Sequence, residues 1–143
     1  MTDAPFRLVV DASVGIKLFV EEEYSDKVHR LFEQLACDLP AIFYVPDLFY
    51  IECTNILLKY TRRFGRSLED SRADLVDLSC LSLRVFPTAE LMEGALLLAA
   101  EQNITAYDAC YGVLASRLDL PLVTADKQLA KAVDALWIGD LEL

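Results

Sequence analysis

The feature that most constrains the fold is the regular alternation of short apolar runs with longer helical patterns. The apolar runs predict five strands, at residues 6–10, 41–45, 81–86, 121–124 and 135–138. Helical spacing and cap residues predict helices between them, at 14–20, 25–36, 47–63, 67–79, 88–102, 105–118 and 126–133. Short apolar strands separated by helices are typical of a parallel sheet covered on both faces. We therefore expect an α/β fold, a three-layer α/β/α sandwich around a central, mostly parallel five-stranded sheet.

The length of 143 residues predicts one domain, spanning residues 1–143. The longest apolar or small run, 94–100, is far shorter than the roughly 20 residues of a membrane span, so we expect no membrane association. The N-terminus lacks a basic start followed by an apolar stretch, which favours a cytoplasmic protein without a signal peptide. The apolar content of 55% is high, and we expect the surplus to cover an interface.

The cysteines and the histidine argue against several kinds of chemistry. The four cysteines form no C-x-x-C pair, which favours buried thiols in a reducing compartment over a zinc site. The single histidine, His29, lies among charged residues of a helical pattern and is expected at the surface. A Ser-His-Asp or Cys-His mechanism would depend on it, and no nucleophile motif accompanies it. Any acid–base chemistry therefore belongs to carboxylates.

Two carboxylates follow predicted strands. Asp11 directly follows the apolar run of LVVDAS, and Asp126 closes LVTAD. In parallel α/β sheets, ligands bind beyond the carboxyl ends of the strands. The alternative is that each aspartate caps the helix that follows it.

Two further carboxylates lie within predicted helices. Asp108 follows Thr105 by three residues, which is also the spacing of a capping box. It shares a helix face with Tyr111, Gly112 and Ala115, and the small residues predict that this face packs closely against something.

Glu52 lies in DLFYIECTNILLKY, where nearly every neighbouring position is apolar, so we expect this helix to be buried. A buried carboxylate costs several kcal/mol unless it is paired, protonated or bound to metal. A buried ion pair with an arginine is the alternative. If the four acids converge on one sheet edge, they repel one another and a hard divalent cation resolves the repulsion. Oxygen ligands without histidine or cysteine favour Mg²⁺ or Mn²⁺.

Three segments, VVDASVGIKLFVEEE, IECTNIL and TAYDACYGVLASRLDLPLVTAD, resemble the PIN-domain family, with the closest likeness to VapC-type toxins. The resemblance implies a metal-dependent ribonuclease, a homodimer and an inhibitory antitoxin protein. It matches the family's four metal-binding and catalytic acids with Asp11, Glu52, Asp108 and Asp126. It also implies supporting polar residues, which here are Ser13, Asn55, Thr105 and Thr124. Many members carry a further acid just after the fourth, whereas this chain has Lys127 and Gln128 there.

The mechanism that the resemblance implies is hydrolysis of RNA phosphodiester bonds. Mg²⁺ or Mn²⁺ held by Asp11, Asp108 and Asp126 would activate water, with Glu52 acting through a water molecule or a second metal ion. Ser13 and Thr124 would orient the ligands or the phosphate. Their alternative is an ordinary role as turn and strand-end hydroxyls.

The net charge of −10 conflicts with binding a polyanion such as RNA. A local basic stretch, KYTRRFGR, supplies the candidate RNA contacts Lys59, Arg62, Arg63 and Arg66, and Lys17 and Lys127 add to them. A solvated helix end is the alternative for this stretch. The overall acidity also suits an antitoxin whose contact surface is basic.

Other readings remain open. A receiver domain would show paired acids after its first strand, where this chain has Val9 and Val10 before Asp11. A haloacid-dehalogenase-like phosphatase would show D-x-D, where Ser13 takes the second position. A non-catalytic PIN-like protein for RNA binding or protein interaction is the third alternative.

Overall fold

The computed structural model describes residues 6–143 and contains a five-stranded sheet in the order β3-β2-β1-β4-β5. All four strand pairings are parallel, so the predicted fold class is confirmed and the sheet is wholly rather than mostly parallel. The strands are β1 (Arg7–Val10), β2 (Ile42–Pro46), β3 (Arg84–Phe86), β4 (Leu122–Thr124) and β5 (Leu136–Trp137). The two edge strands, β3 and β5, are shorter than predicted, because an edge strand forms a ladder on one side only.

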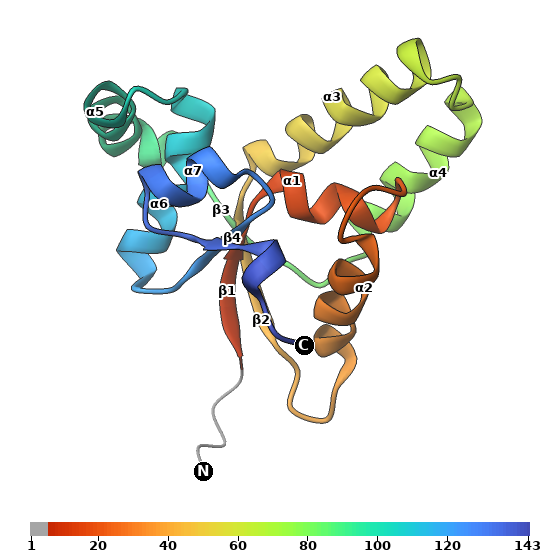
Figure 1. The fold of residues 1–143 in the computed structure, drawn as a ribbon, viewed down its shortest axis with the longest axis horizontal. Helices are drawn as coiled ribbons and strands as arrows, with labels where there is room; N and C mark the ends of the chain where they lie inside the picture. Colours follow the sequence, from red (N-terminus) through yellow and green to blue (C-terminus); the bar gives the residue numbers. More distant parts are fainter. Residues whose placement is uncertain (1–5) are drawn as a thin grey trace.

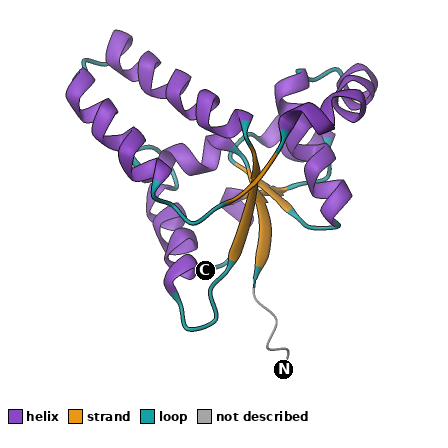
Figure 2. Ribbon diagram, turned by 180° about the vertical axis from the view of Figure 1, so that it is seen from behind, coloured by secondary structure: helices purple, strands orange, loops and turns teal. Residues whose placement is uncertain are grey.

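Helices cover both faces of this sheet, which gives the predicted three layers (Figures 1 and 2). They are α1 (Ala12–Gly15), α2 (Ser25–Glu33), α3 (Leu48–Arg63), α4 (Leu68–Ser79), α5 (Met92–Gln102), α6 (Ala106–Leu118) and α7 (Lys127–Ala132). Figure 1 shows α1 to α4 on one side of the sheet and α5 to α7 on the other. Short 3₁₀ turns at 16–18, 34–36, 88–91 and 138–140 extend or introduce several of these helices.

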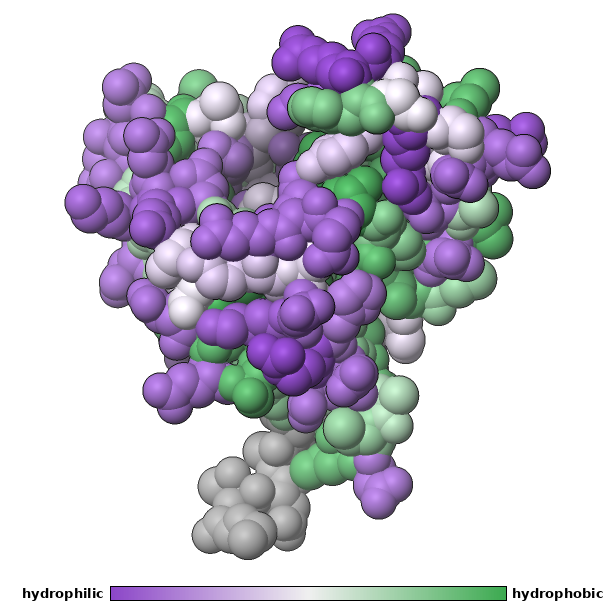
Figure 3. Space-filling model, turned by 45° about the vertical axis from the view of Figure 1, so that its right-hand side comes forward, coloured by the Kyte–Doolittle hydropathy of each residue, from purple (hydrophilic) through white to green (hydrophobic). Residues whose placement is uncertain are grey.

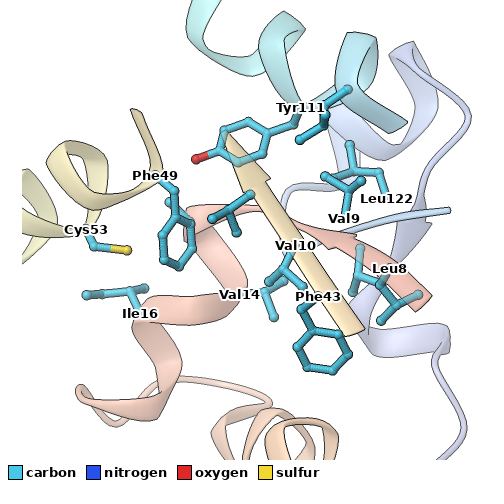
Figure 4. Packing of buried hydrophobic residues seen from close by; sticks show 14 of the residues in the cluster. Leu8, Val9, Val10, Val14, Ile16, Phe43, Phe49, Cys53, Tyr111 and Leu122 are labelled. Atoms are coloured by element: carbon cyan, nitrogen blue, oxygen red, sulfur yellow. The ribbon is translucent and has the colours of Figure 1, made fainter. Parts of the chain in front are cut away.

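The core lies on both faces of the central strands (Figure 4). The β1 residues Leu8, Val9 and Val10 have no exposed surface, as expected for a strand that helices cover on both faces. Phe43 of β2 and Tyr111 of α6 are equally buried. This core fixes the position of the carboxyl end of β1, where Asp11 follows.

Gly15 brings α1 unusually close to α3. A Cβ atom at Gly15 would lie 2.7 Å from Cζ of Phe49, a fully buried ring that has little room to move. Only glycine therefore allows this approach between the two helices. The contact joins the helix that follows Asp11 to the helix that carries Glu52.

Three sequence expectations can be checked on the described residues. His29 is exposed, as predicted. Cys53 and Cys110 are buried, but the prediction is wrong for Cys37 and Cys80, which lie exposed where helical segments end. The closely packed face of α6 is confirmed, since a Cβ at Gly112 would meet Leu98 at 3.1 Å and Val133 at 3.2 Å.

The expectation that α3 is buried on all sides is wrong. Only Phe49, Cys53 and Leu57 of this helix are fully buried, whereas Ile51 is 64% exposed. The reason is that α3 runs outward with α4 as an arm beyond the sheet (Figure 1), so one stripe alone meets the core.

Large apolar side chains are exposed on several helices. They include Ile51, Phe64, Leu68, Val76, Met92, Leu96, Leu97 and Tyr107. Figure 3 shows apolar atoms at the surface on the side that carries the α3–α4 arm. No helix within residues 6–143 is long and apolar enough to cross a membrane.

Candidate metal centre

Asp11 lies at the carboxyl end of β1, beside the end of β4. The two strands are neighbours, with Val10 opposite Val123, and the amide of Asp11 donates to the carbonyl of Val123 at 3.0 Å. Two hydroxyls donate to Oδ2 of Asp11, Ser13 Oγ at 2.6 Å and Thr124 Oγ1 at 2.8 Å. The structure therefore brings together three of the predicted site residues: Asp11 just after β1, Ser13 in α1 and Thr124 at the end of β4.

Burial dominates the electrostatics of Asp11. The residue is only 5% exposed, and desolvation is the largest of the causes that together raise its pKa from 3.8 to about 6. The hydrogen bonds from Ser13 and Thr124 oppose the rise by stabilising the carboxylate, and the negative charge of Asp108 adds to it.

Glu52 extends from α3 toward the same sheet edge and is half-buried. The hydroxyl of Tyr111 donates to its Oε1 at 2.6 Å. The pKa of Glu52 is raised from 4.5 to about 7, mainly by desolvation. The Tyr111 hydrogen bond opposes this rise, and the charges of Asp11 and Asp108 add to it. The ion pairs within the described residues are Lys17–Glu22 and Arg66–Asp74, so the predicted alternative of an arginine partner for Glu52 is not observed.

Tyr111 is a site residue that the sequence reasoning missed. Tyr111 is fully buried in α6. The one feature of the sequence that pointed to it was its position three residues after Asp108, on the same helix face. The hydroxyl of a buried tyrosine requires a hydrogen-bond partner, and Glu52 provides it. The charges of Asp11 and Glu52 add to burial in raising the pKa of Tyr111, so this hydroxyl stays a donor.

Asp108 stands in the first turn of α6. Its amide donates to Thr105 Oγ1 at 3.1 Å, which confirms Thr105 as the N-cap of the helix. Burial raises the pKa of Asp108, and the negative charge of Asp126 raises it further. Asp108 thus lies within electrostatic reach of Asp11, Glu52 and Asp126.

Asp126 acts as a helix cap in this structure, which was the alternative to a ligand role. Its Oδ1 accepts from the amides of Gln128 at 2.9 Å and Leu129 at 3.2 Å, and the residue is exposed at the start of α7. Its own amide donates to Thr124 Oγ1 at 3.1 Å, so the hydroxyl of Thr124 links Asp126 to Asp11.

Three of the four acids share a pattern in which one oxygen is anchored. Asp11 uses Oδ2, Glu52 uses Oε1 and Asp126 uses Oδ1, and the second oxygen of each has no side-chain donor among residues 6–143. In this arrangement, no three acid, histidine or cysteine side chains of the described part stand close enough to form a complete ligand set. The chemistry of the set still fits a hard divalent cation, because its donors are all carboxylate oxygens and no cationic side chain of residues 6–143 pairs with them.

Two of the remaining predicted residues, Asn55 and Lys59, line hollows beside these acids. Asn55 is exposed and lines a hollow of about 400 Å³ with Glu52 and Tyr107. Lys59 lines a second hollow of about 300 Å³ with Ser13 and Asp126. Ile56 lines both, so the two hollows adjoin along α3.

The arginines of the basic stretch lie farther along the α3–α4 arm. Arg62 is ten residues beyond Glu52, about 15 Å along the helix axis, and both it and Arg63 are exposed. Arg66 forms an ion pair with Asp74, so its charge is already matched within the chain. Lys127 lies over the Trp137 ring, 4.2 Å from its centre.

The raised pKa of Glu52 predicts how the metal-free protein responds to pH. Its pKa is about 7 in the folded chain and 4.5 ordinarily, so its stabilising contribution is complete below pH 4.5 and is lost as the pH rises through 7. We expect Glu52→Gln to remove this loss, since a glutamine oxygen still accepts from Tyr111. Allowing for partial solvent screening, the variant should gain about 1–2 kcal/mol of stability at pH 8.

Thermal unfolding in EDTA at pH 5.5 and pH 8 measures this effect. The difference corresponds to a Tm change of several degrees. If the Tm of the parent and of Glu52→Gln changed equally between the two pH values, ionisation of Glu52 would not destabilise the parent, and the prediction would be wrong.

Comparison with known proteins shows the family to which this chain belongs. The family model of the PIN domain matches residues 8–135. Ribonuclease VapC3 of Pyrobaculum aerophilum is 36% identical over 133 residues, which cover 91% of this chain and 97% of the relative.

Two solved structures share the fold. The crystal structure of PAE2754 from Pyrobaculum aerophilum has a TM-score of 0.66 at 24% identity, covering 94% of this chain and 90% of that one. A toxin–antitoxin complex from Klebsiella pneumoniae contains a chain with a TM-score of 0.60 at 15% identity, covering 86% and 89%. The family model spans all four acids, the VapC3 relative matches over nearly its whole length, and the chain therefore belongs to the PIN-domain family.

Proposed function

We propose that this protein is a ribonuclease that depends on Mg²⁺ or Mn²⁺ and acts as the toxin of a type II toxin–antitoxin pair. The observation that carries the proposal is the arrangement of carboxylates around the carboxyl ends of β1 and β4. The Thr124 hydroxyl joins Asp11 to Asp126, and the charges of Asp11 and Asp108 raise the pKa of Glu52. No cationic side chain of residues 6–143 is paired with these four acids. Similarity to Ribonuclease VapC3 supports the choice of RNA as the substrate.

Each acid has a separate role in this proposal. Asp11, Asp108 and Asp126 would hold the cation through their carboxylate oxygens. A bound Mg²⁺ or Mn²⁺ supplies Lewis-acid activation of water and offsets the negative charge that develops on the phosphate. Ser13 and Thr124 hold Asp11 in one orientation by donating to its Oδ2.

Glu52 is suited to hold or accept a proton. With its pKa near 7, it exchanges a proton at neutral pH, and it faces the hollow that also contains Asn55. Tyr111 keeps Oε1 engaged, so the other oxygen of Glu52 is the one available to water.

The proposed partners are an antitoxin and a second copy of the chain. The exposed apolar side chains of α3, α4 and α5 offer more surface than a monomer usually leaves in water. The net charge of −10 favours a basic contact surface on the antitoxin.

Cleavage of structured RNA by purified protein, free of antitoxin, tests the proposal. We expect strand cutting with Mg²⁺ or Mn²⁺ and loss of cutting in EDTA, because phosphodiester hydrolysis here requires the cation. Restoration by Mn²⁺ after chelation is the matched control. Equal cutting with and without EDTA would contradict metal dependence, and absence of cutting together with absence of metal binding would favour a non-catalytic PIN-like protein.

A further inference from the structure

The hollow of about 300 Å³ next to the carboxylates contains charges that the catalytic proposal does not use. It lies between the turn at 16–18, the inner stripe of α3 and the loop from β4 to α7. Its lining includes Ser13 and Asp126 of the candidate metal centre together with Lys17 and Lys59. It is therefore continuous with the candidate metal centre and offers two amines to whatever enters it.

Lys17 is an unusual lysine because it is only 8% exposed. Lysine is rarely buried to this degree, since the ammonium group loses much of its hydration. Its Nζ contacts Oε1 of Glu22 at 3.2 Å. An ammonium group has three N–H donors, and Glu22 is its hydrogen-bond partner within residues 6–143, so two donors remain for another acceptor.

Glu22 is itself held from two sides. Its Oε1 accepts from Lys17, and its Oε2 accepts from the hydroxyl of Tyr60, which comes from α3. Because both oxygens are engaged, Glu22 fixes Lys17 at the wall of the hollow. Tyr60 lies next to Lys59 and eight residues after Glu52, so one helix supplies the support for Lys17, the second amine and the Glu52 carboxylate.

The charge balance of the hollow favours an anion once the acids hold a cation. Lys17 and Lys59 face Glu22 and Asp126 there. When Asp126 is neutralised by a metal ion, the remaining lining is net positive. A phosphodiester group provides the oxygen acceptors that the free donors of a buried ammonium need.

We propose that this hollow binds the RNA phosphate adjacent to the bond that is cut, with Lys17 and Lys59 as its contacts. Glu22 and Tyr60 act as positioning residues that hold Lys17 in place. The inference rests on the proposed ribonuclease function and deepens it. It explains how a chain of net charge −10 can bind RNA, because the positive charge is concentrated beside the site rather than spread over the surface.

Binding of a short fluorescent single-stranded RNA, measured by anisotropy over a series of KCl concentrations, tests this proposal. The variants are made in the chain with Asp11 intact, and Ca²⁺ replaces Mg²⁺ so that a cation still neutralises the acids while cleavage is suppressed during the measurement. We expect Lys17→Met to weaken binding by roughly 5- to 10-fold and to reduce the slope of log K against log salt by about 0.7, the value for one lost phosphate contact on a single strand. Lys17→Arg should keep the slope, and Lys59→Gln should reduce it as Lys17→Met does.

The controls separate this role from a purely structural ion pair. Arg30→Gln removes an exposed cation of α2 that does not line the hollow, and it should leave both affinity and slope unchanged. If Lys17→Met lowers the Tm but keeps the parent's salt slope, Lys17 is only a structural partner of Glu22 and the proposal is wrong. Should Lys17→Met fail to fold, the exposed Lys59 decides, and an unchanged slope in Lys59→Gln overturns the phosphate site.

The same titration distinguishes failure of this inference from failure of the ribonuclease proposal. If the parent binds RNA and both lysine variants keep the parent's slope of log K against log salt, the phosphate site in the hollow is rejected and the ribonuclease proposal is unaffected. If the parent protein neither binds RNA nor cuts it in the presence of Mg²⁺ or Mn²⁺, the ribonuclease proposal is rejected, and this inference is rejected with it.

Discussion

Replacement of Asp11 by asparagine is expected to lower the rate of RNA cleavage by about 10³-fold, with little change in the fold. Ser13 and Thr124 both donate to one oxygen of Asp11, and an asparagine oxygen can accept the same two bonds. What asparagine lacks is the negative charge that a divalent cation requires. Since burial of that charge is unfavourable, the metal-free variant should be as stable as the parent or slightly more stable.

A matched control for this variant is Asp77→Asn, an exposed aspartate on α4. It changes the net charge by the same amount, so it corrects for the weaker electrostatic repulsion of RNA. Single-turnover cleavage at saturating Mn²⁺ measures the effect. Equal rates for Asp11→Asn and the parent would mean that another site, or a contaminating nuclease, cuts the RNA.

Tyr111→Phe is expected to lower cleavage by roughly 10- to 100-fold, the cost that is typical for loss of a residue that orients a catalytic carboxylate. The phenylalanine ring fills the same buried space, so the main change is loss of the 2.6 Å hydrogen bond to Glu52. Because this bond lowers the pKa of Glu52, its removal should raise that pKa above its present value of about 7. The pH–rate profile should therefore move to higher pH.

Tyr44→Phe, on β2, is a suitable control because it removes a hydroxyl from a partly buried tyrosine elsewhere in the chain. The shift of the pH–rate profile is the informative measurement, since a general loss of stability would not produce it. A profile that stays in place, with a rate like that of Tyr44→Phe, would show that Tyr111 merely fills space.

The sheet edge and its acids could be predicted from the sequence because they depend on local patterns. An apolar run that ends on a carboxylate predicts Asp11 at a strand end, and parallel strands bring such ends together. The structure adds the pairing of β1 with β4, which makes Thr124 a hydrogen-bond donor to Asp11. The capping role of Thr105 also followed from its spacing to Asp108, whereas a supporting role for Ser13 was expected only from the resemblance to the PIN-domain family.

Other features depend on contacts between distant segments and could not be predicted. The Tyr111–Glu52 bond joins α6 to α3 across 59 positions of sequence, and no local pattern encodes it. The apolar residues of α3 suggested full burial, but the same composition also suits an arm with an exposed interface face. Arg66 looked like a free cation in the sequence, whereas its partner Asp74 comes from the next helix.

The measurement that tests the central claim most directly is calorimetric titration of Mn²⁺ into the purified protein at about pH 8, where Asp11 and Glu52 are ionised. The account predicts saturable binding by the parent and by Asp77→Asn, and loss of that binding in Asp11→Asn. Binding of equal strength by Asp11→Asn, or no binding by the parent, would contradict the assignment of these carboxylates as a metal site.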